Sequence, residues 1–226
     1  MPRITVVGSS NVDFVTRVPR LPGPGETVGG GSFSQVFGGK GANTATAVAR
    51  LRGAGTHASF ITAVGNDPFA RMMLENFDRD GLDASASIRV DDIASGTASI
   101  LVDPQGRNCI AVSPGANERL LPEHIDAAEA LLRDSQMVVM QMELTAETTR
   151  HTIARCVEWK VPVMLNYAPV DAKAVPVDAS IAILVVNEHE AAALMDGSVA
   201  GSPDDAIAVA TALRRAGAGH SGRHHW

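Results

Sequence analysis

Ile181-Ala182-Ile183-Leu184-Val185-Val186 is the stretch that decides the fold. It is apolar throughout, with no polar residue at alternate positions. A strand of this kind is covered on both faces, as in a parallel sheet that has helices on either side. The stretch therefore predicts an α/β protein rather than an antiparallel sheet with one face in water.

Strands and helices alternate around this stretch. The predicted strands lie at 137–141, 161–165 and 181–186, and the predicted helices lie at 122–133, 145–160, 188–195 and 203–216. Ser202 followed by Pro203 is a typical helix start, a capping hydroxyl before proline at the first helical position. This alternation is typical of the βα units that build a parallel sheet.

The N-terminal half adds strands and a smaller antiparallel element. Thr5-Val6-Val7-Gly8 predicts a buried strand, and further strands are predicted at 32–37 and 59–64, each followed by a helical pattern. Alternating segments at 97–102 and 108–112 are joined by Asp103-Pro104-Gln105-Gly106, which is a turn sequence. They predict a β-hairpin inserted beside the α/β core.

Composition excludes several classes of protein. The 226 residues are 45% hydrophobic and carry a formal net charge of −6, which excludes a disordered chain and argues against a nucleic-acid binder. No apolar run reaches the ~18 residues of a membrane span, and the N-terminus has no signal-peptide pattern, so we expect a cytoplasmic protein. Cys109 and Cys156 show neither disulfide nor zinc spacing and are predicted to be inert core residues.

Polar residues follow the predicted strands at one edge of the sheet. They are Asn11, Asp13, Glu143, Asn166, Asn187 and Glu190. Ligands of open parallel sheets bind beyond the carboxyl ends of the strands, where these side chains would meet. Turn preference alone explains a single asparagine or aspartate, but Glu143 and Glu190 gain nothing from turn chemistry.

A glycine-rich loop, Gly38-Gly39-Lys40-Gly41-Ala42-Asn43, joins a predicted strand to a helix. Its glycines let backbone N–H groups approach a ligand closely. It is not a Walker A loop, because Gly41 stands where that loop needs serine or threonine after the lysine.

A series of short motifs, in family order, resembles the PfkB carbohydrate kinases, and among them the ribokinase branch. They are Val7-Gly8-Ser9-Ser10-Asn11-Val12-Asp13, Pro22-Gly23-Pro24-Gly25-Glu26-Thr27, Phe37-Gly38-Gly39-Lys40-Gly41-Ala42-Asn43, Ala63-Val64-Gly65-Asn66-Asp67, Ser113-Pro114-Gly115-Ala116-Asn117, Met140-Gln141-Met142-Glu143, Leu165-Asn166-Tyr167-Ala168-Pro169 and Asn187-Glu188-His189-Glu190-Ala191. The resemblance implies a three-layer ribokinase-like α/β sandwich with a mostly parallel central sheet and a small antiparallel β lid, formed by about 14–37 and 97–113. It also implies a homodimer that pairs through this lid.

The resemblance further implies ATP-dependent phosphorylation of a pentose, first of all D-ribose at its terminal hydroxyl. Sugar contacts are expected from Asn11, Asp13, Gly39, Lys40, Gly41, Asn43 and Glu143. Asn187 is expected on the nucleotide side, and Asn187 with Glu190 is expected to position Mg²⁺ through water. Another sugar or nucleoside kinase of the family, and a non-catalytic fragment that binds sugar or dimerises, remain alternatives.

Several positions depart from the family pattern. Tyr167 and Val186 stand where proline is usual, and Ala70 replaces a common glycine. The family's Gly-Ala-Gly-Asp segment, which supplies the anion hole and the aspartate base, is not among the 226 residues, and neither is its monovalent-cation site. We therefore expect 1–219 to be an incomplete domain, 220–226 to be an aberrant tail, and this chain as written to be inactive.

We predict a change of reading frame near Gly219. His220-Ser221-Gly222-Arg223-His224-His225-Trp226 is polar and aperiodic where a buried strand is expected. Codons for this run, read one base later, permit Thr-Ala-Val-Val-Thr-Thr-Gly, which is strand-like. Resequencing the locus checks this, and a shifted frame without a Gly-Ala-Gly-Asp segment before its next stop contradicts it.

Overall fold

A parallel sheet forms the body of the protein. The computed structural model describes residues 2–53, 55–170, 175, 177–178, 180–194, 211 and 220–223. The strands of the sheet, in spatial order, are β12 (His220–Arg223), β11 (Ile183–Val186), β10 (Val163–Asn166), β9 (Met137–Gln141), β1 (Arg3–Val7) and β4 (His57–Ile61). All neighbouring pairs are parallel, as the apolar stretch at 181–186 predicts.

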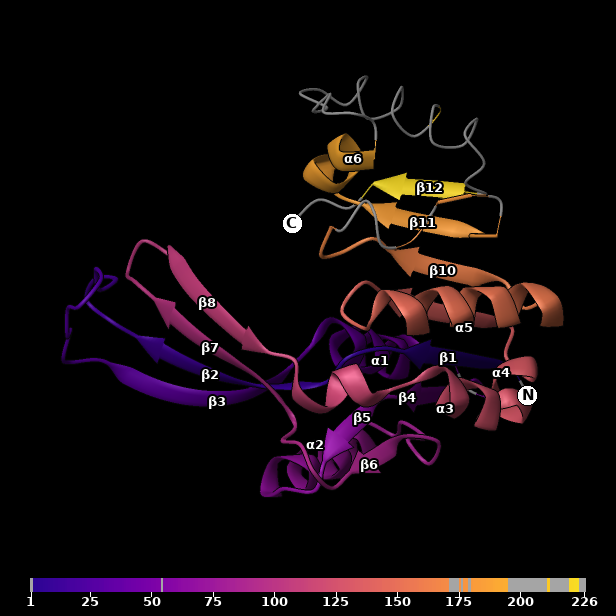
Figure 1. Ribbon diagram of the computed structural model, residues 1–226, viewed down its shortest axis with the longest axis horizontal. Helices are drawn as coiled ribbons and strands as arrows, with labels where there is room; N and C mark the ends of the chain where they lie inside the picture. Colours follow the sequence, from indigo (N-terminus) through magenta and orange to yellow (C-terminus); the bar gives the residue numbers. More distant parts are fainter. Residues whose placement is uncertain are drawn as a thin grey trace.

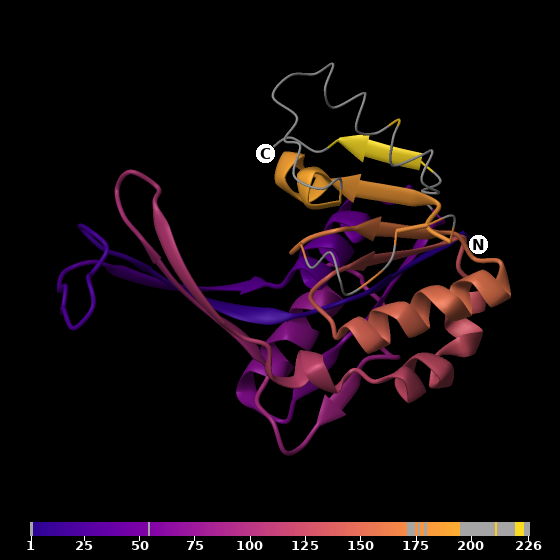
Figure 2. The same ribbon diagram turned by 45° about the horizontal axis from the view of Figure 1, so that its top comes forward.

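Helices cover both faces of this sheet and give the predicted three-layer sandwich (Figure 1, Figure 2). On one face lie α1 (Lys40–Leu51) and α2 (Pro68–Arg79), and on the other lie α3 (Pro122–Ala127), α4 (Glu129–Arg133) and α5 (Ala146–Trp159). Val138 packs into the core beneath α5, and its neighbour Val139 packs into the core beneath α1. Both residues are apolar because successive strand residues point to opposite faces of the sheet, and helices cover both faces.

The lid is a separate sheet that projects from the body (Figure 1). Its strands, in spatial order, are β3 (Ser32–Gly38), β2 (Asn11–Arg17), β7 (Gly96–Val102) and β8 (Asn108–Ser113). The pairs β2–β3 and β7–β8 are antiparallel, whereas the central pair β2–β7 is parallel because both strands leave the body in the same direction. Asn11 and Asp13 follow the first strand, as expected, and both lie on a second strand, β2, that was not predicted.

Two predicted elements are each divided in the structure. The strand predicted at 59–64 ends at Ile61, and β5 (Ala63–Gly65) pairs instead with β6 (Ile88–Val90) in a small sheet of its own. Thr62 separates them because its backbone bonds Ser87 and Ile88 rather than continuing the ladder. The helix predicted at 122–133 breaks at Ala128, where ψ is 11°.

Other boundaries lie close to their predictions. The helix predicted at 145–160 is α5, with Thr145 accepting a hydrogen bond from the Thr148 backbone and Lys160 in the left-handed conformation at its end. The helix α6 (Glu188–Leu194) follows β11. The predicted helix at 203–216 lies outside the described residues, apart from residue 211.

The strand β12 was not predicted, because its side chains are polar and aperiodic. It pairs in parallel with β11 at the edge of the sheet, from His220 opposite Ile183 to Arg223 opposite Val186. Backbone N–H and C=O groups form such a ladder whatever the side chains are. The strand therefore lies where the expected edge strand belongs, although it lacks an apolar pattern.

One of the two cysteines contradicts its prediction. Cys156 is buried in α5 as expected, and burial raises the pKa of its thiol to about 12. Cys109 is exposed, because every residue of β8 lies at the open edge of the lid rather than in a core.

Tyr167 is fully buried, and its hydroxyl donates to the carbonyl of Val175 at 3.1 Å.

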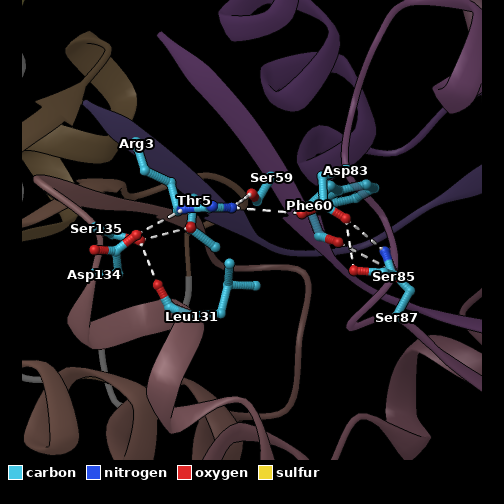
Figure 3. A network of polar contacts seen from close by, with 10 residues as sticks. All are labelled: Arg3, Thr5, Ser59, Phe60, Asp83, Ser85, Ser87, Leu131, Asp134 and Ser135. Carbon is cyan, nitrogen blue, oxygen red and sulfur yellow. Dashed lines mark hydrogen bonds and ion pairs between the residues drawn. The ribbon is translucent and has the colours of Figure 1, made fainter. Parts of the chain in front are cut away.

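Polar contacts tie the strands together at the amino edge of the sheet, opposite the polar residues singled out above (Figure 3). The Arg3 guanidinium donates to the Ser59 hydroxyl at 2.8 Å and forms ion pairs with Asp83 and Asp134. The buried Thr5 and Ser135 hydroxyls lie 2.7 Å apart and share a hydrogen bond.

Among the described residues, no helix is long and apolar enough to cross a membrane.

Candidate functional site

A cavity of about 320 Å³, lined by both polar and apolar side chains, lies where the lid joins the body. Four segments line it: the β1–β2 connection with the first residue of β2, the end of β8 with the short helix η1 (Gly115–Arg119), the segment after β9, and the segment after β10. The lining residues are Ser9, Asn11, Val112, Pro114, Asn117, Glu118, Met142, Glu143, Leu144, Thr145 and Pro169. Of the predicted sugar contacts, Asn11 and Glu143 are brought together here.

Glu143 joins the segment after β9 to the start of α1. Its Oε2 accepts from the Ser9 hydroxyl at 2.6 Å and from the Lys40 backbone N–H at 2.8 Å. Gly39, which precedes the helix, has no side chain to cap it, so the carboxylate supplies both the acceptor and the negative charge that a helix N-terminus favours. The other oxygen, Oε1, receives no hydrogen bond from the described part of the chain and is available to a ligand.

Glycines allow these segments to meet. A Cβ on Gly41 would lie 2.4 Å from the Ser9 backbone nitrogen, far inside van der Waals contact. Gly39 has a φ of +90° and would place its Cβ 2.9 Å from the Cα of Ser10. The loop singled out in the sequence therefore packs the start of α1 directly on the β1–β2 connection.

Asp13 lies on β2 beside this cavity rather than in its lining. A Cβ on Gly38 would lie 2.1 Å from Asp13 Oδ2, so the neighbouring strand leaves space for the carboxylate. Burial, and secondarily the charge of Glu143, raises the pKa of Asp13. A pair of carboxylates close enough to interact is suited to accept protons from several hydroxyl groups of one ligand.

Asn43 is not among the residues that line the cavity. It is exposed in the first turn of α1, and its backbone N–H bonds the carbonyl of Gly39 at 2.9 Å. Lys40 contributes its backbone N–H to Glu143, as described above.

Asn117 is a residue of this site to which the sequence analysis gave no role. It is buried, lines the cavity and bonds Ser10, Asn11 and Pro114. Its motif, Ser113-Pro114-Gly115-Ala116-Asn117, was recognised as a family motif only, because its contacts are with residues about a hundred positions earlier.

Asn187 and Glu190 lie together at the carboxyl end of β11, away from this cavity. The Asn187 backbone and side-chain amides donate to the two carboxylate oxygens of Glu190 at 2.7 and 2.9 Å, and the Glu190 backbone N–H donates to Asn187 Oδ1 at 2.9 Å. This reciprocal cap starts α6. Each carboxylate oxygen keeps a lone pair for a water molecule, which fits the predicted water-mediated Mg²⁺ contact. Within the described ranges, no three metal-ligating side chains cluster.

A three-layer α/β body with a lid, and with a cavity at the carboxyl edge of its sheet, is the arrangement in which open α/β sheets bind small ligands. The model of the pfkB family of carbohydrate kinases matches residues 1–220, and the chain belongs to this family. The assignment confirms the resemblance drawn from the motifs.

Relatives within the family include ribokinases. The chain is 36% identical to the ribokinase of Schizosaccharomyces pombe, over 87% of this chain and 63% of that one. It is 37% identical to the deoxyribokinase of Salmonella typhi, over 74% of this chain and 53% of that one. It is also similar to the structure of Arabidopsis thaliana ribokinase complexed with ribose and ATP, with a TM-score of 0.85 and 26% identity over 98% of this chain and 71% of that one. The chain thus spans between half and two thirds of the length of these two curated relatives.

We predict that Asp13→Asn stabilises the fold at neutral pH. Because burial raises the pKa of Asp13, the folded state binds a proton more readily than the unfolded state, and ionisation destabilises the fold as pH rises through this range. Thermal unfolding from pH 3 to 8 should show a higher Tm for the variant at pH 7, and the difference should shrink as the parent carboxylate becomes protonated.

Asp67→Asn is the matched control, with the opposite sign. Burial opposes ionisation of Asp67, but hydrogen bonds from the Ser95 and Ala70 backbones and from the Ser95 hydroxyl outweigh it and lower its pKa. This variant should have a lower Tm than the parent at pH 7, with a difference that shrinks at acid pH. If Asp13→Asn is less stable than the parent at pH 7, the charge of Asp13 does not destabilise the fold and this prediction is wrong.

Proposed function

We propose that the cavity beside the lid binds a pentose, D-ribose first, for phosphorylation of its terminal hydroxyl by ATP. The observation that carries this proposal is the meeting of Asn11 and Glu143 in one cavity, with the Asp13 carboxylate beside them. Carboxylates and carboxamides are the groups that recognise several hydroxyls of a small sugar. Membership of a carbohydrate kinase family, with ribokinases among the relatives, supports the sugar assignment.

The chain's own residues position the sugar and exclude water. Asp13 and Glu143 Oε1 accept hydrogen bonds from sugar hydroxyls, while Glu143 Oε2 stays bonded to Ser9 and to α1. Gly39, Lys40 and Gly41 form the adjoining wall of the site, and Asn43 joins it when the sugar and lid close together. The lid covers the sugar, because phosphoryl transfer requires that water does not compete for the phosphoryl group.

ATP and Mg²⁺ would bind at the same edge of the sheet, beside Asn187 and Glu190. Mg²⁺ held there would supply positive charge against the phosphate oxygens. Asn187 would contact the nucleotide side, and Glu190 would hold Mg²⁺ through water, because its cap to Asn187 leaves lone pairs open on both carboxylate oxygens.

Two other activities are compatible with this geometry. The deoxyribokinase relative favours 2-deoxy-D-ribose as a second candidate sugar. A chain that binds sugar without turnover is the other, because no Gly-Ala-Gly-Asp segment is among its 226 residues. Turnover therefore needs to be measured separately from binding, as ribose-dependent ADP formation.

We predict that Asp13→Ala strongly weakens ribose binding. A partly buried carboxylate that bridges two hydroxyls contributes ~2–4 kcal/mol, which weakens binding by about thirtyfold or more. Isothermal titration calorimetry with D-ribose and 2-deoxy-D-ribose measures this and ranks the two sugars. Asp92→Ala, at an exposed acid outside the site, is the control and should bind as the parent does. An unchanged ribose affinity in Asp13→Ala contradicts the proposed site.

We also propose that two copies of the chain pair through the lid. Val36, Ile110 and Val112 are 46%, 52% and 60% exposed. The strand register places them on the same face of the lid as Asp13, which pairs with Val36 and Ala98, and Ala98 pairs with Val112. A single copy of the chain leaves these apolar side chains in water. The face is therefore suited to contact a second copy.

Ile110→Asp should therefore convert a dimer into a monomer, because it places a charge on this apolar face beside Val112. Sedimentation velocity measures the change. Cys109→Asp is the matched control, since the neighbouring side chain on β8 points to the opposite face of the lid. A parent chain that is monomeric at tens of micromolar, or a variant that stays dimeric, contradicts pairing through this face.

A further inference from the structure

Asn117 occupies an unusual position, because it contacts both the root of the lid and a residue of the proposed sugar site. It is 2% exposed and lies in η1, just after β8 leaves the lid. Its side chain bonds the backbone of Ser10 and Pro114 and the side chain of Asn11. These contacts link the end of β8 to the start of β2.

The orientation of the Asn117 carboxamide follows from backbone groups whose roles are unambiguous. The Ser10 N–H, which can only donate, lies 2.8 Å from Asn117 Oδ1. The carbonyls of Pro114 and Ser10, which can only accept, lie 2.9 and 3.2 Å from Asn117 Nδ2. A flipped amide would place like groups against each other at each of these contacts, so Asn117 has a single orientation.

This orientation determines that of Asn11. Asn117 Nδ2 donates to Asn11 Oδ1 at 2.8 Å, so the Asn11 carbonyl is used inside the protein. Asn11 Nδ2 has no hydrogen-bond partner within the described ranges and is not among the buried side-chain atoms that lack one. Because Asn11 lines the cavity, its NH₂ group is the part left for a ligand.

We propose that Asn117 is a positioning residue that makes Asn11 a hydrogen-bond donor to the sugar. The site then has a defined polarity, in which Asn11 donates to a sugar oxygen while Asp13 and Glu143 accept from sugar hydroxyls. It accepts a hydroxyl, which both donates and accepts, but disfavours an ammonium group facing Asn11, which only donates. This inference rests on the proposed pentose site.

Glycine at position 96 is needed for this arrangement. A Cβ there would lie 2.2 Å from Asn11 Oδ1 and 2.3 Å from Asn117 Nδ2. The first residue of β7 therefore leaves room for the bond between the two asparagines, and a side chain at this position would separate them.

A double-mutant cycle on D-ribose binding tests the proposal. Asn117→Asp keeps the acceptor for Ser10 N–H but removes the donor to Asn11, which then turns its NH₂ group inward. We expect its Kd to rise about tenfold. In an Asn11→Ala background the same substitution should change Kd less than about twofold, because its effect passes through Asn11. Equal, additive effects in both backgrounds overturn the proposal.

Asn108→Asp, the same change at an exposed position of β8, is the control for added charge and should bind ribose as the parent does. Asn11→Asp keeps the acceptor for Asn117 and so retains the internal bond if Asn117→Asp does not fold. It should bind ribose no better than Asn11→Ala, because it has lost the donor. Affinity equal to that of the parent would show that Asn11 acts as an acceptor and overturns the proposal.

Failure of the proposed function is distinguishable from failure of this inference. If the parent protein binds no pentose, the sugar assignment fails, but the polarity of the two asparagines is still measurable by NMR. The Asn117 side-chain NH₂ protons should be protected from exchange with water and those of Asn11 should exchange rapidly. Protected Asn11 protons with unprotected Asn117 protons overturn the inference without any ligand.

Discussion

The two hydrogen bonds to Glu143 Oε2 hold the site together. One comes from the Ser9 hydroxyl in the β1–β2 connection, and the other comes from the backbone of Lys40 at the start of α1. Three segments far apart in sequence are thus joined at one carboxylate oxygen. Removal of the carboxylate would leave a helix N-terminus and a buried hydroxyl without their acceptor, so the same group serves packing and ligand binding.

The carboxylate of Asp13 lies in surroundings that disfavour its ionised form. Asp13 is placed close enough to Glu143, and buried enough, that its pKa is raised. Asp67, on the N-terminal side of α2, shows the contrary arrangement, since its carboxylate caps α2 and accepts a hydrogen bond from the Ser95 backbone. One aspartate stabilises the fold, and the other is retained at the expense of stability, which is typical of a group kept for a ligand.

Local sequence patterns predicted the layers and the helix ends. The features that they did not predict depend on pairing between segments far apart in the sequence. The apolar stretch at 181–186 predicted the parallel sheet, and α5 begins after Thr145 and ends before Lys160, as expected. The strand β2 was missed because its partners, β3 and β7, begin 21 and 85 residues after Asn11. The exposure of Cys109 and the contacts of Asn117 likewise depend on how distant segments dock, which periodicity does not contain. The polar residues at the strand ends were recognised, but their grouping into one cavity and one separate helix cap needed the fold.

The parallel pairing of β2 with β7 has a consequence for how the chain folds. Asn11 pairs with Gly96, so the centre of the lid closes a loop that contains β4, α1 and α2. Only the outer pairs of the lid can form as neighbours in sequence, and the centre must wait until the segments between have compacted, because closing so long a loop is entropically unfavourable beforehand. We therefore expect the body to acquire protection from hydrogen exchange before the lid does during refolding, so the last part of this protein to form is the part that covers its ligand.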